Sequence, residues 1–122
     1  MGKFIVRTVR SGIKFDLTAS NGQTILTSEV YTTMAACRKG MESVSKNAPI
    51  AGVENQTEEG YAILGHPKFE MYQDRAGGYR FRLKARNGKI IAVSESYIAK
   101  AGCLNGIESV KNNAADAQIM EG

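Results

Sequence analysis

The sequence is poor in the residue types that build catalytic and metal sites. Its 122 residues include one histidine and two cysteines, and tryptophan is absent. His66 alone cannot complete a Cys–His or Ser–His–Asp arrangement, and neither Cys37 nor Cys103 has a cysteine or histidine neighbour at zinc-ligand spacing. We therefore expect no catalytic residues, no metal site and no bound cofactor, and we predict that the protein is not an enzyme.

Long apolar segments and framework cysteines are missing as well. No apolar run approaches the ~18 residues of a transmembrane helix, and residues 1–6 reach a charge too early for a secretory signal. Two cysteines are too few for a disulfide framework. The composition, 43% hydrophobic and 23% charged, is that of an ordinary folded domain. These features predict a cytoplasmic protein that does not contact a membrane.

Positive charge is in modest excess and is unevenly distributed. Sixteen Lys and Arg residues against twelve Asp and Glu residues give a net charge of +4. Within residues 75–89 there are six basic residues and no acidic one, so this segment should carry a positive surface potential. The six are Arg75, Arg80, Arg82, Lys84, Arg86 and Lys89.

The chain contains the same motif twice. Residues 12–48 and 78–114 align without a gap at an offset of 66, and 18 of the 37 positions are identical. Unrelated sequences would match at only a few positions, so the chain is a duplication and each copy must fold in the same way. We divide it into a first repeat at residues 1–55, a connector at 56–67 and a second repeat at 68–122.

Each copy has the pattern of three strands followed by a helix. Alternation of apolar and polar residues predicts strands, and Asn21-Gly22 and Asn87-Gly88 stand where a two-residue type I′ hairpin turn is expected. The apolar period then changes to 3.6, which predicts a helix ending near Pro49 in the first copy. Short segments around Val53 and Ile119 are long enough for a fourth strand, and residues 61–64 in the connector could pair as part of another.

These elements predict an α+β architecture of two β-β-β-α-β repeats. A unit of about 55 residues is marginal alone, so we expect the two repeats to share one core and to form one compact domain. Both helices should cover one face of a common antiparallel sheet, and the other face should be open to water. The expected state is a monomer with an internal pseudo-dimer.

Several motifs of the second copy resemble the YegP-like family of small bacterial proteins, which has no established activity. The resemblance covers nearly the whole chain, and the first copy departs from the pattern at Asp16, Met34, Arg38, Lys39 and Met41. It implies paired β(3)-α-β motifs in a single sheet whose C-terminal strands are exchanged between the motifs. The segments that carry it are residues 79–85, 87–88, 94–97 and 100–111.

Most repeated polar residues have a structural explanation. Ser28, Tyr31 and their equivalents Ser94 and Tyr97 suit a strand-to-helix corner, with serine bonding the backbone and tyrosine as a half-buried anchor. Cys37 and Cys103 fall in the apolar stripes of their helices and should be buried. Gly40 and Gly106 indicate close approach of each helix to the sheet or to the other helix.

The basic segment is the one feature that indicates a binding function. Arg80, Arg82, Lys84 and Arg86 alternate along a strand, so they share a face at ~7 Å spacing and could track phosphates. The face has no interleaved aromatic residue for base stacking, the row is not repeated in the first copy, and Glu70 and Glu95 could neutralise it. An ordinary solvated face is therefore the simpler interpretation.

Two functions remain open at this point. The first is a non-catalytic binding or accessory module that contacts a protein partner through its open sheet face. The alternative is a weak nucleic-acid binder that contacts the phosphate backbone through residues 75–89.

Overall fold

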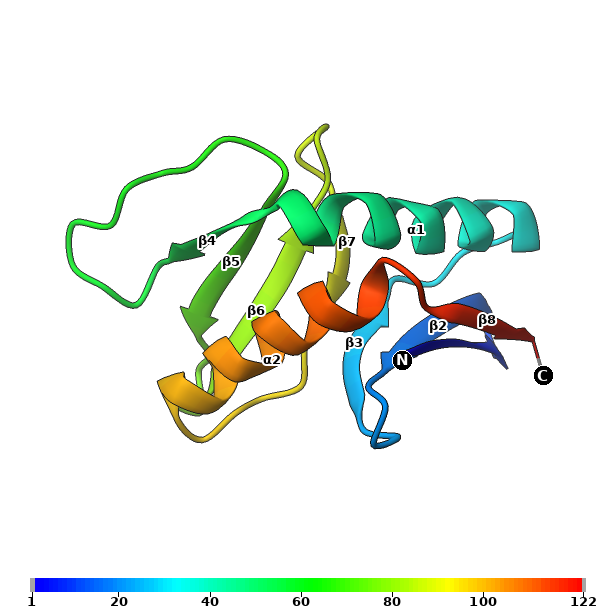
Figure 1. The fold of residues 1–122 in the computed structure, drawn as a ribbon, viewed down its shortest axis with the longest axis horizontal. Helices are drawn as coiled ribbons and strands as arrows, with labels where there is room; N and C mark the ends of the chain where they lie inside the picture. Colours follow the sequence, from blue (N-terminus) through cyan, green and yellow to red (C-terminus); the bar gives the residue numbers. More distant parts are fainter. Residues whose placement is uncertain (1, 122) are drawn as a thin grey trace.

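The structure, a computed structural model, describes residues 2–121 and repeats one chain path twice (Figure 1). A short 3₁₀ turn, Ala48–Ile50, follows the first helix. The first copy forms β1 (Lys3–Val9), β2 (Gly12–Thr18), β3 (Thr24–Ser28), α1 (Met34–Asn47) and β4 (Gly52–Asn55). The second copy forms β5 (Lys68–Gln73), β6 (Tyr79–Lys84), β7 (Ile90–Val93), α2 (Lys100–Ala114) and β8 (Gln118–Glu121).

All eight strands belong to one sheet with the order β4-β5-β6-β7-β3-β2-β1-β8. The copies join where β3 pairs antiparallel with β7, and there Thr27 lies opposite Val93. These two residues are related by the repeat offset of 66. A pseudo-twofold axis therefore passes between them and relates the two halves of the sheet.

The fourth strand of each copy lies in the other half of the sheet. β4 pairs parallel with β5, and β8 pairs parallel with β1. The exchange implied by the family resemblance is thus confirmed, together with the α+β class. The sheet is mixed and not antiparallel throughout. In each copy the segment after the helix runs parallel to the first strand of the other copy, β4 beside β5 and β8 beside β1.

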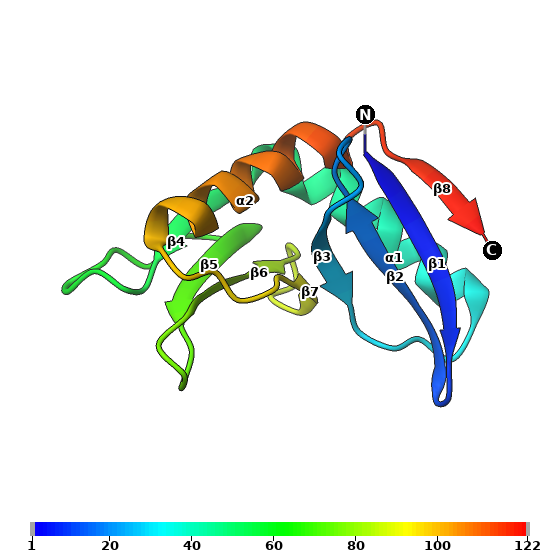
Figure 2. The same cartoon turned by 90° about the horizontal axis from the view of Figure 1, so that it is seen from below.

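Both helices lie on the same side of the sheet (Figure 2), and the core fills the space between. Phe4 and Phe15 meet edge to face at 5.5 Å, and Phe69 and Phe81 repeat the contact at 5.8 Å. All four rings are at most 1% exposed. No helix in residues 2–121 is long and apolar enough to cross a membrane.

The hairpin turns differ from the expected type I′. Only the glycines have positive φ, +84° at Gly22 and +81° at Gly88, whereas Asn21 and Asn87 do not. The Gly22 N–H donates to the Ala19 carbonyl at 2.9 Å, which closes a turn with a left-handed glycine as its last residue. The asparagine Oδ1 accepts the N–H two residues later, and this local hydrogen bond favours the observed turn over the two-residue type I′ turn. Residues 61–64 are not a strand.

The strand-to-helix corners are as predicted. Ser28 Oγ accepts the Phe15 N–H at 2.9 Å and donates to the Glu29 carbonyl at 2.7 Å. The Tyr31 ring stacks on Phe15 with centroids 6.3 Å apart, and the second copy repeats both contacts. Thr33 caps α1 by accepting the Ala36 N–H at 3.1 Å.

Candidate anion-binding site

The central part of the predicted basic row is paired with carboxylates on the helix-free face of the sheet. Arg82 Nε lies 2.6 Å from Glu70 Oε1, and Lys84 Nζ lies 3.2 Å from Glu70 Oε2. Arg80 Nε lies 3.0 Å from Asp74 Oδ2 and lowers the pKa of that carboxyl. These three cations therefore contribute little free positive charge.

A buried ion cluster lies beside them, and the sequence analysis did not find it. Lys68 Nζ lies 2.7 Å from Glu54 Oε1 and 3.3 Å from Glu70 Oε2, and all three side chains are at most 5% exposed. Burial alone would raise the pKa of Glu54, but hydrogen bonds from Lys68, Gln56 and the Leu64 N–H lower it to about 2. The pKa of Glu70 is lowered in the same way, against the effect of burial.

The cluster also fixes the connector. Leu64 N–H donates to Glu54 Oε1 at 2.8 Å, and Gln56 Nε2 donates to Glu54 Oε2 at 2.7 Å. Glu54 lies opposite Glu70 in the β4–β5 register, so a residue of the first copy completes the ion pairs of the second. This part of the open face is an internally compensated structural network.

The other three predicted cations are exposed and separated. Arg75 lies in the β5–β6 turn, whereas Arg86 and Lys89 lie in the β6–β7 turn at the other end of β6. None of the three forms an ion pair with the residues that the structure describes. The six residues therefore form no continuous unpaired patch, and anion binding by them stays a prediction.

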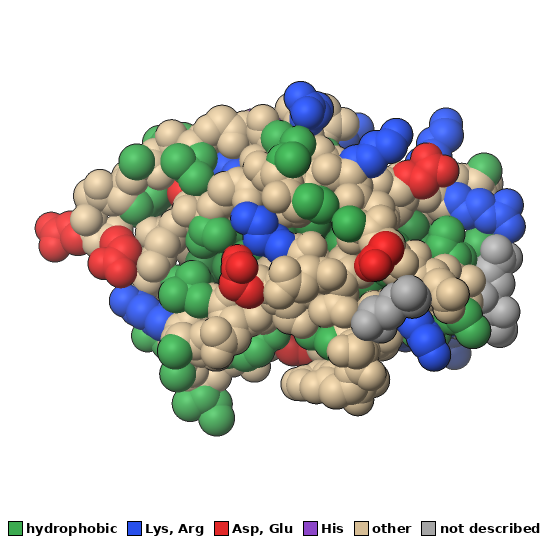
Figure 3. All heavy atoms as spheres, viewed as in Figure 1, with side chains coloured by type: hydrophobic (Ala, Val, Ile, Leu, Met, Phe, Trp, Pro, Cys, Tyr) green, Lys and Arg blue, Asp and Glu red, His purple; other side chains and the backbone are tan. Residues whose placement is uncertain are grey.

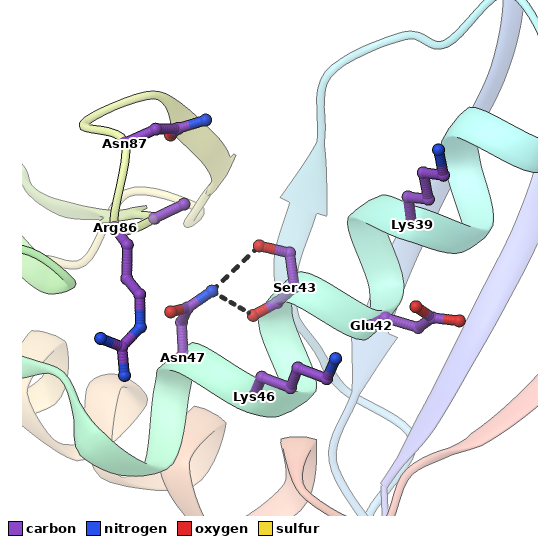
Figure 4. A pocket seen from close by; sticks show the side chains of 8 residues that line it. Lys39, Glu42, Ser43, Lys46, Asn47, Arg86 and Asn87 are labelled. Carbon is purple, nitrogen blue, oxygen red and sulfur yellow. Dashed lines mark hydrogen bonds between the residues drawn. The ribbon is translucent and has the colours of Figure 1, made fainter.

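Arg86 instead lies across a groove from α1, here called the α1 groove (Figure 4), and Lys89 also lines this groove. It consists of two adjoining cavities of about 440 and 430 Å³, both lined by Lys39, Ser43 and Asn87. Lys46 and Arg86 line the first cavity, and Lys89 lines the second.

Four cations thus surround the groove, and none of them is ion-paired within residues 2–121. Glu42 lines the first cavity, but in Figure 4 its carboxylate points away from Arg86. Glu29 lines the second cavity. Figure 3 shows Lys and Arg side chains gathered along the edge of the molecule over α1 and the β6–β7 hairpin.

The pseudo-twofold axis produces a second groove between α2 and the β2–β3 hairpin, with a cavity of about 180 Å³. Each of its eight lining residues is the equivalent, at the offset of 66, of a residue that lines the α1 groove. Tyr97, Ile25 and Ala19 keep the residue types of Tyr31, Ile91 and Ala85, whereas Thr24 replaces Ile90 and none of the cations is kept. The four equivalent pairs are Lys39 and Asn105, Lys46 and Asn112, Arg86 and Ser20, and Lys89 and Gln23.

Sequence reasoning named Arg86 and Lys89 as candidates but missed Lys39 and Lys46 as their partners. Lys39 was noted only as a departure from the family pattern. The signal was available, because a comparison of the copies position by position shows that these cations have neutral polar equivalents. What was missing was the knowledge that a helix of one copy faces the hairpin of the other.

The remaining chemically active residue types are not assembled into a site. Cys103 is buried, and burial raises the pKa of its thiol to about 11, so it is protonated at neutral pH. His66 lies exposed in the connector. Within residues 2–121, no group of three or more His, Cys, Asp or Glu side chains is arranged to hold a metal ion.

Comparison with known proteins agrees with the fold. A family model described as a domain of unknown function, DUF1508, matches residues 12–55 and 74–121. A UPF0339 protein from the ptx operon 5′ region of Stutzerimonas stutzeri is 37% identical over 121 residues, covering 98% of this chain and 96% of that protein. A UPF0339 protein of Treponema denticola is 61% identical over 54 residues, which are 44% of this chain and 93% of that protein.

A solved structure extends the agreement to three dimensions. The solution structure of YegP from E. coli, a protein of unknown function, has a TM-score of 0.79 and 33% identity, covering 99% of this chain and 92% of that one. The chain therefore belongs to the DUF1508 (UPF0339) family of proteins of unknown function, in agreement with the resemblance to YegP-like proteins.

Proposed function

We propose that this protein is a non-catalytic binding module that contacts nucleic acid through phosphate groups in the α1 groove. One observation carries the proposal: two grooves related by the pseudo-twofold axis share a tyrosine, an isoleucine and an alanine in their linings, and only one groove is surrounded by unpaired cations. The repeated fold does not require the four cations, because the second groove is built at the equivalent positions without them. Their common feature is a positively charged side chain in the lining of one groove.

The types of cation suit phosphate. An arginine guanidinium can bind two phosphate oxygens at once, and lysine supplies a mobile point charge. Lys39, Ser43 and Lys46 are spaced four and three residues apart, so they form one stripe on α1. Arg86 and Lys89 provide the opposite wall, and a backbone lying between the walls would be contacted from both sides.

The predicted protein-binding role of the open sheet face has less support. In the second half of the sheet that face carries the ion network around Glu70. In the first half Arg7 pairs with Asp16 at 2.9 Å, and Thr27 donates to the same carboxylate. Contact with a protein partner through this face stays a prediction.

The proposal is tested by exchanging the four cations for their equivalents in the other copy. The variant Lys39→Asn, Lys46→Asn, Arg86→Ser and Lys89→Gln keeps residue types that the same fold already accommodates. Four phosphate contacts predict a slope of about −3 for log affinity against log salt with single-stranded nucleic acid. We expect this slope for the unmodified chain and a slope near zero for the variant, measured by fluorescence anisotropy between about 50 and 200 mM salt.

A control variant removes the same charge elsewhere. It changes four cations that lie outside the groove and form no ion pair: Lys3→Asn, Arg10→Ser, Lys14→Asn and Arg75→Gln. This variant should keep most of the affinity. Equal losses in the two variants would mean that net charge alone is responsible, and no binding by the unmodified chain would overturn the proposal.

A further inference from the structure

We infer that the nucleic acid bound in the α1 groove is single-stranded, with an unpaired base in the apolar end of the groove. This inference rests on the proposed function and specifies its ligand. The starting point is the chemical difference between the two cavities that make up the groove.

Both cavities of the groove are lined by cations, and the second also has large apolar side chains in its walls. Lys46 and Arg86 line only the first cavity, whereas Tyr31, Ile90 and Ile91 line only the second. The cavities are continuous, because Lys39, Ser43, Ala85 and Asn87 line both. A ligand that fills the groove therefore needs an anionic part next to an apolar part, as in a nucleotide.

The apolar end also offers polar groups for the edge of a base. Glu29 lines this cavity and can accept a hydrogen bond from the N3–H of a thymine. Asn87 Oδ1 accepts the Lys89 N–H at 3.0 Å, and this bond directs the side chain while its amide N–H groups can still donate. At about 430 Å³ the cavity is within the size range of small-molecule sites.

The cations lie along the groove and not around one point. Lys39 and Lys46 are separated by seven residues of helix, or about 10 Å. Cations spread along this length can contact successive phosphates of one strand at the same time. A chain of several nucleotides therefore uses all four cations together, whereas a free phosphate uses only some of them.

A duplex cannot use the apolar end. Its bases are paired and stacked, so only phosphates could reach the cations and the cavity beside Tyr31 and Ile90 would stay empty. In a single strand a base can leave the stack without breaking a pair and contribute burial energy. The groove should consequently prefer single strands over duplexes.

The experiment compares three fluorescent probes by anisotropy at constant salt: an oligothymidylate of about 12 nucleotides, an abasic strand of the same length, and a duplex of the same length. We expect the oligothymidylate to bind about tenfold more tightly than the abasic strand, because burial of one base contributes on this scale. Ile90→Thr, which introduces the residue of the equivalent Thr24, should weaken oligothymidylate binding about fourfold and leave the abasic strand unaffected.

The outcomes separate this inference from the proposed function. Equal affinity for the three probes, with loss of binding in the four-cation variant, would overturn the single-strand inference and leave phosphate binding in place. No binding of any probe would overturn both. Preference for the oligothymidylate that Ile90→Thr does not change would place the base elsewhere and would also overturn the inference.

Discussion

Gly40 and Gly106 lie inside helices because a tyrosine occupies the space of a side chain. A Cβ on Gly106 would overlap the hydroxyl oxygen of Tyr97 and lie 2.8 Å from its Cζ. Tyr97 stacks on Phe81 at 6.3 Å, so it cannot move without disturbing the core. Tyr31 occupies the same position above Gly40. Glycine destabilises each helix by about 1 kcal/mol relative to alanine, and the tyrosine contact that it permits offsets this loss.

Gly106→Ala should therefore destabilise the protein although alanine favours helix. Overpacking typically costs about 1–3 kcal/mol, which exceeds the helix propensity gained. Gly102→Ala is the matched control in the same helix, because its Cβ would lie 3.5 Å from Tyr97 Cδ1, an ordinary contact. Urea denaturation should show a lower free energy of unfolding for Gly106→Ala and an increase of up to about 1 kcal/mol for Gly102→Ala. Equal effects of the two changes would contradict this explanation.

The sequence indicated that the helical glycines lie in close contact with another group, but it did not identify that group. A helical glycine predicts close approach, and we expected the sheet or the other helix. A Cβ on Gly106 would lie 3.1 Å from Phe81 of the sheet, as expected, but the nearest group is the Tyr97 phenol. The Asn-Gly turns behaved similarly. The dipeptide marked each hairpin, but φ at Asn21 depends on whether its side chain bonds the backbone, which composition does not reveal.

The strands β5 and β6 of the second repeat depend on buried Lys68, which pairs with Glu54 of β4 and with Glu70 of β5. Lys68→Met should lower the free energy of unfolding by about 3 kcal/mol, because it leaves Glu54 and Glu70 buried with an incomplete set of partners. Lys3→Met is the matched control, since Lys3 is the equivalent of Lys68 in the first copy and is exposed. Its effect should stay within about 0.5 kcal/mol. Chemical denaturation at neutral pH measures the loss in the free energy of unfolding for each variant. Similar losses for Lys68→Met and Lys3→Met would mean that the ion cluster adds no stability.

The same cluster should make the protein sensitive to acid. The folded-state pKa of Glu54, about 2, lies below its ordinary value of 4.5, and that of Glu70 is also lowered. Their contribution to stability is therefore complete above about pH 4.5 and is lost as the pH falls toward 2. Glu54→Gln should make the pH dependence of unfolding shallower in this interval. The difference in the free energy of unfolding between the unmodified chain and Lys68→Met should also become smaller in this pH interval. A difference that does not change with pH would contradict the stabilising role of the ionised Glu54 and Glu70.

The strands were predictable from alternation, but this cluster was not. Lys68 and Glu54 are fourteen residues apart and belong to different repeats. They meet only because β4 crosses to pair with β5, so neither pattern nor spacing within one copy brings them together. Glu70 was named as a possible partner of the basic row because it stands on the neighbouring strand, where the hairpin alone sets the register.

For the whole molecule, the internal repeat predicted most of the fold, and the family resemblance supplied the exchange of strands. Neither could place the α1 groove, which lies between a helix of the first copy and a hairpin of the second. The helix ends are also joined across the copies: Ser45 Oγ donates to the Ala114 carbonyl at 2.8 Å, and its equivalent Lys111 donates to the Ala51 carbonyl at 2.9 Å. Charge and function can therefore differ between two grooves that the repeat makes alike.

Strand exchange makes each copy incomplete without the other. A fragment of residues 66–122 contains β5 and β8, but in the full chain these strands pair with β4 and β1 of the first copy. The Treponema denticola relative matches this chain over 54 residues, which are 93% of its own length, so it is about as long as one copy. The fragment should therefore fold as a homodimer in which each β8 pairs with the β5 of its partner.

The melting temperature of the fragment should rise with protein concentration, because dissociation accompanies unfolding, whereas that of the full chain should not. A fragment that melts as a monomer at a concentration-independent temperature would show that one copy buries enough core to stand alone.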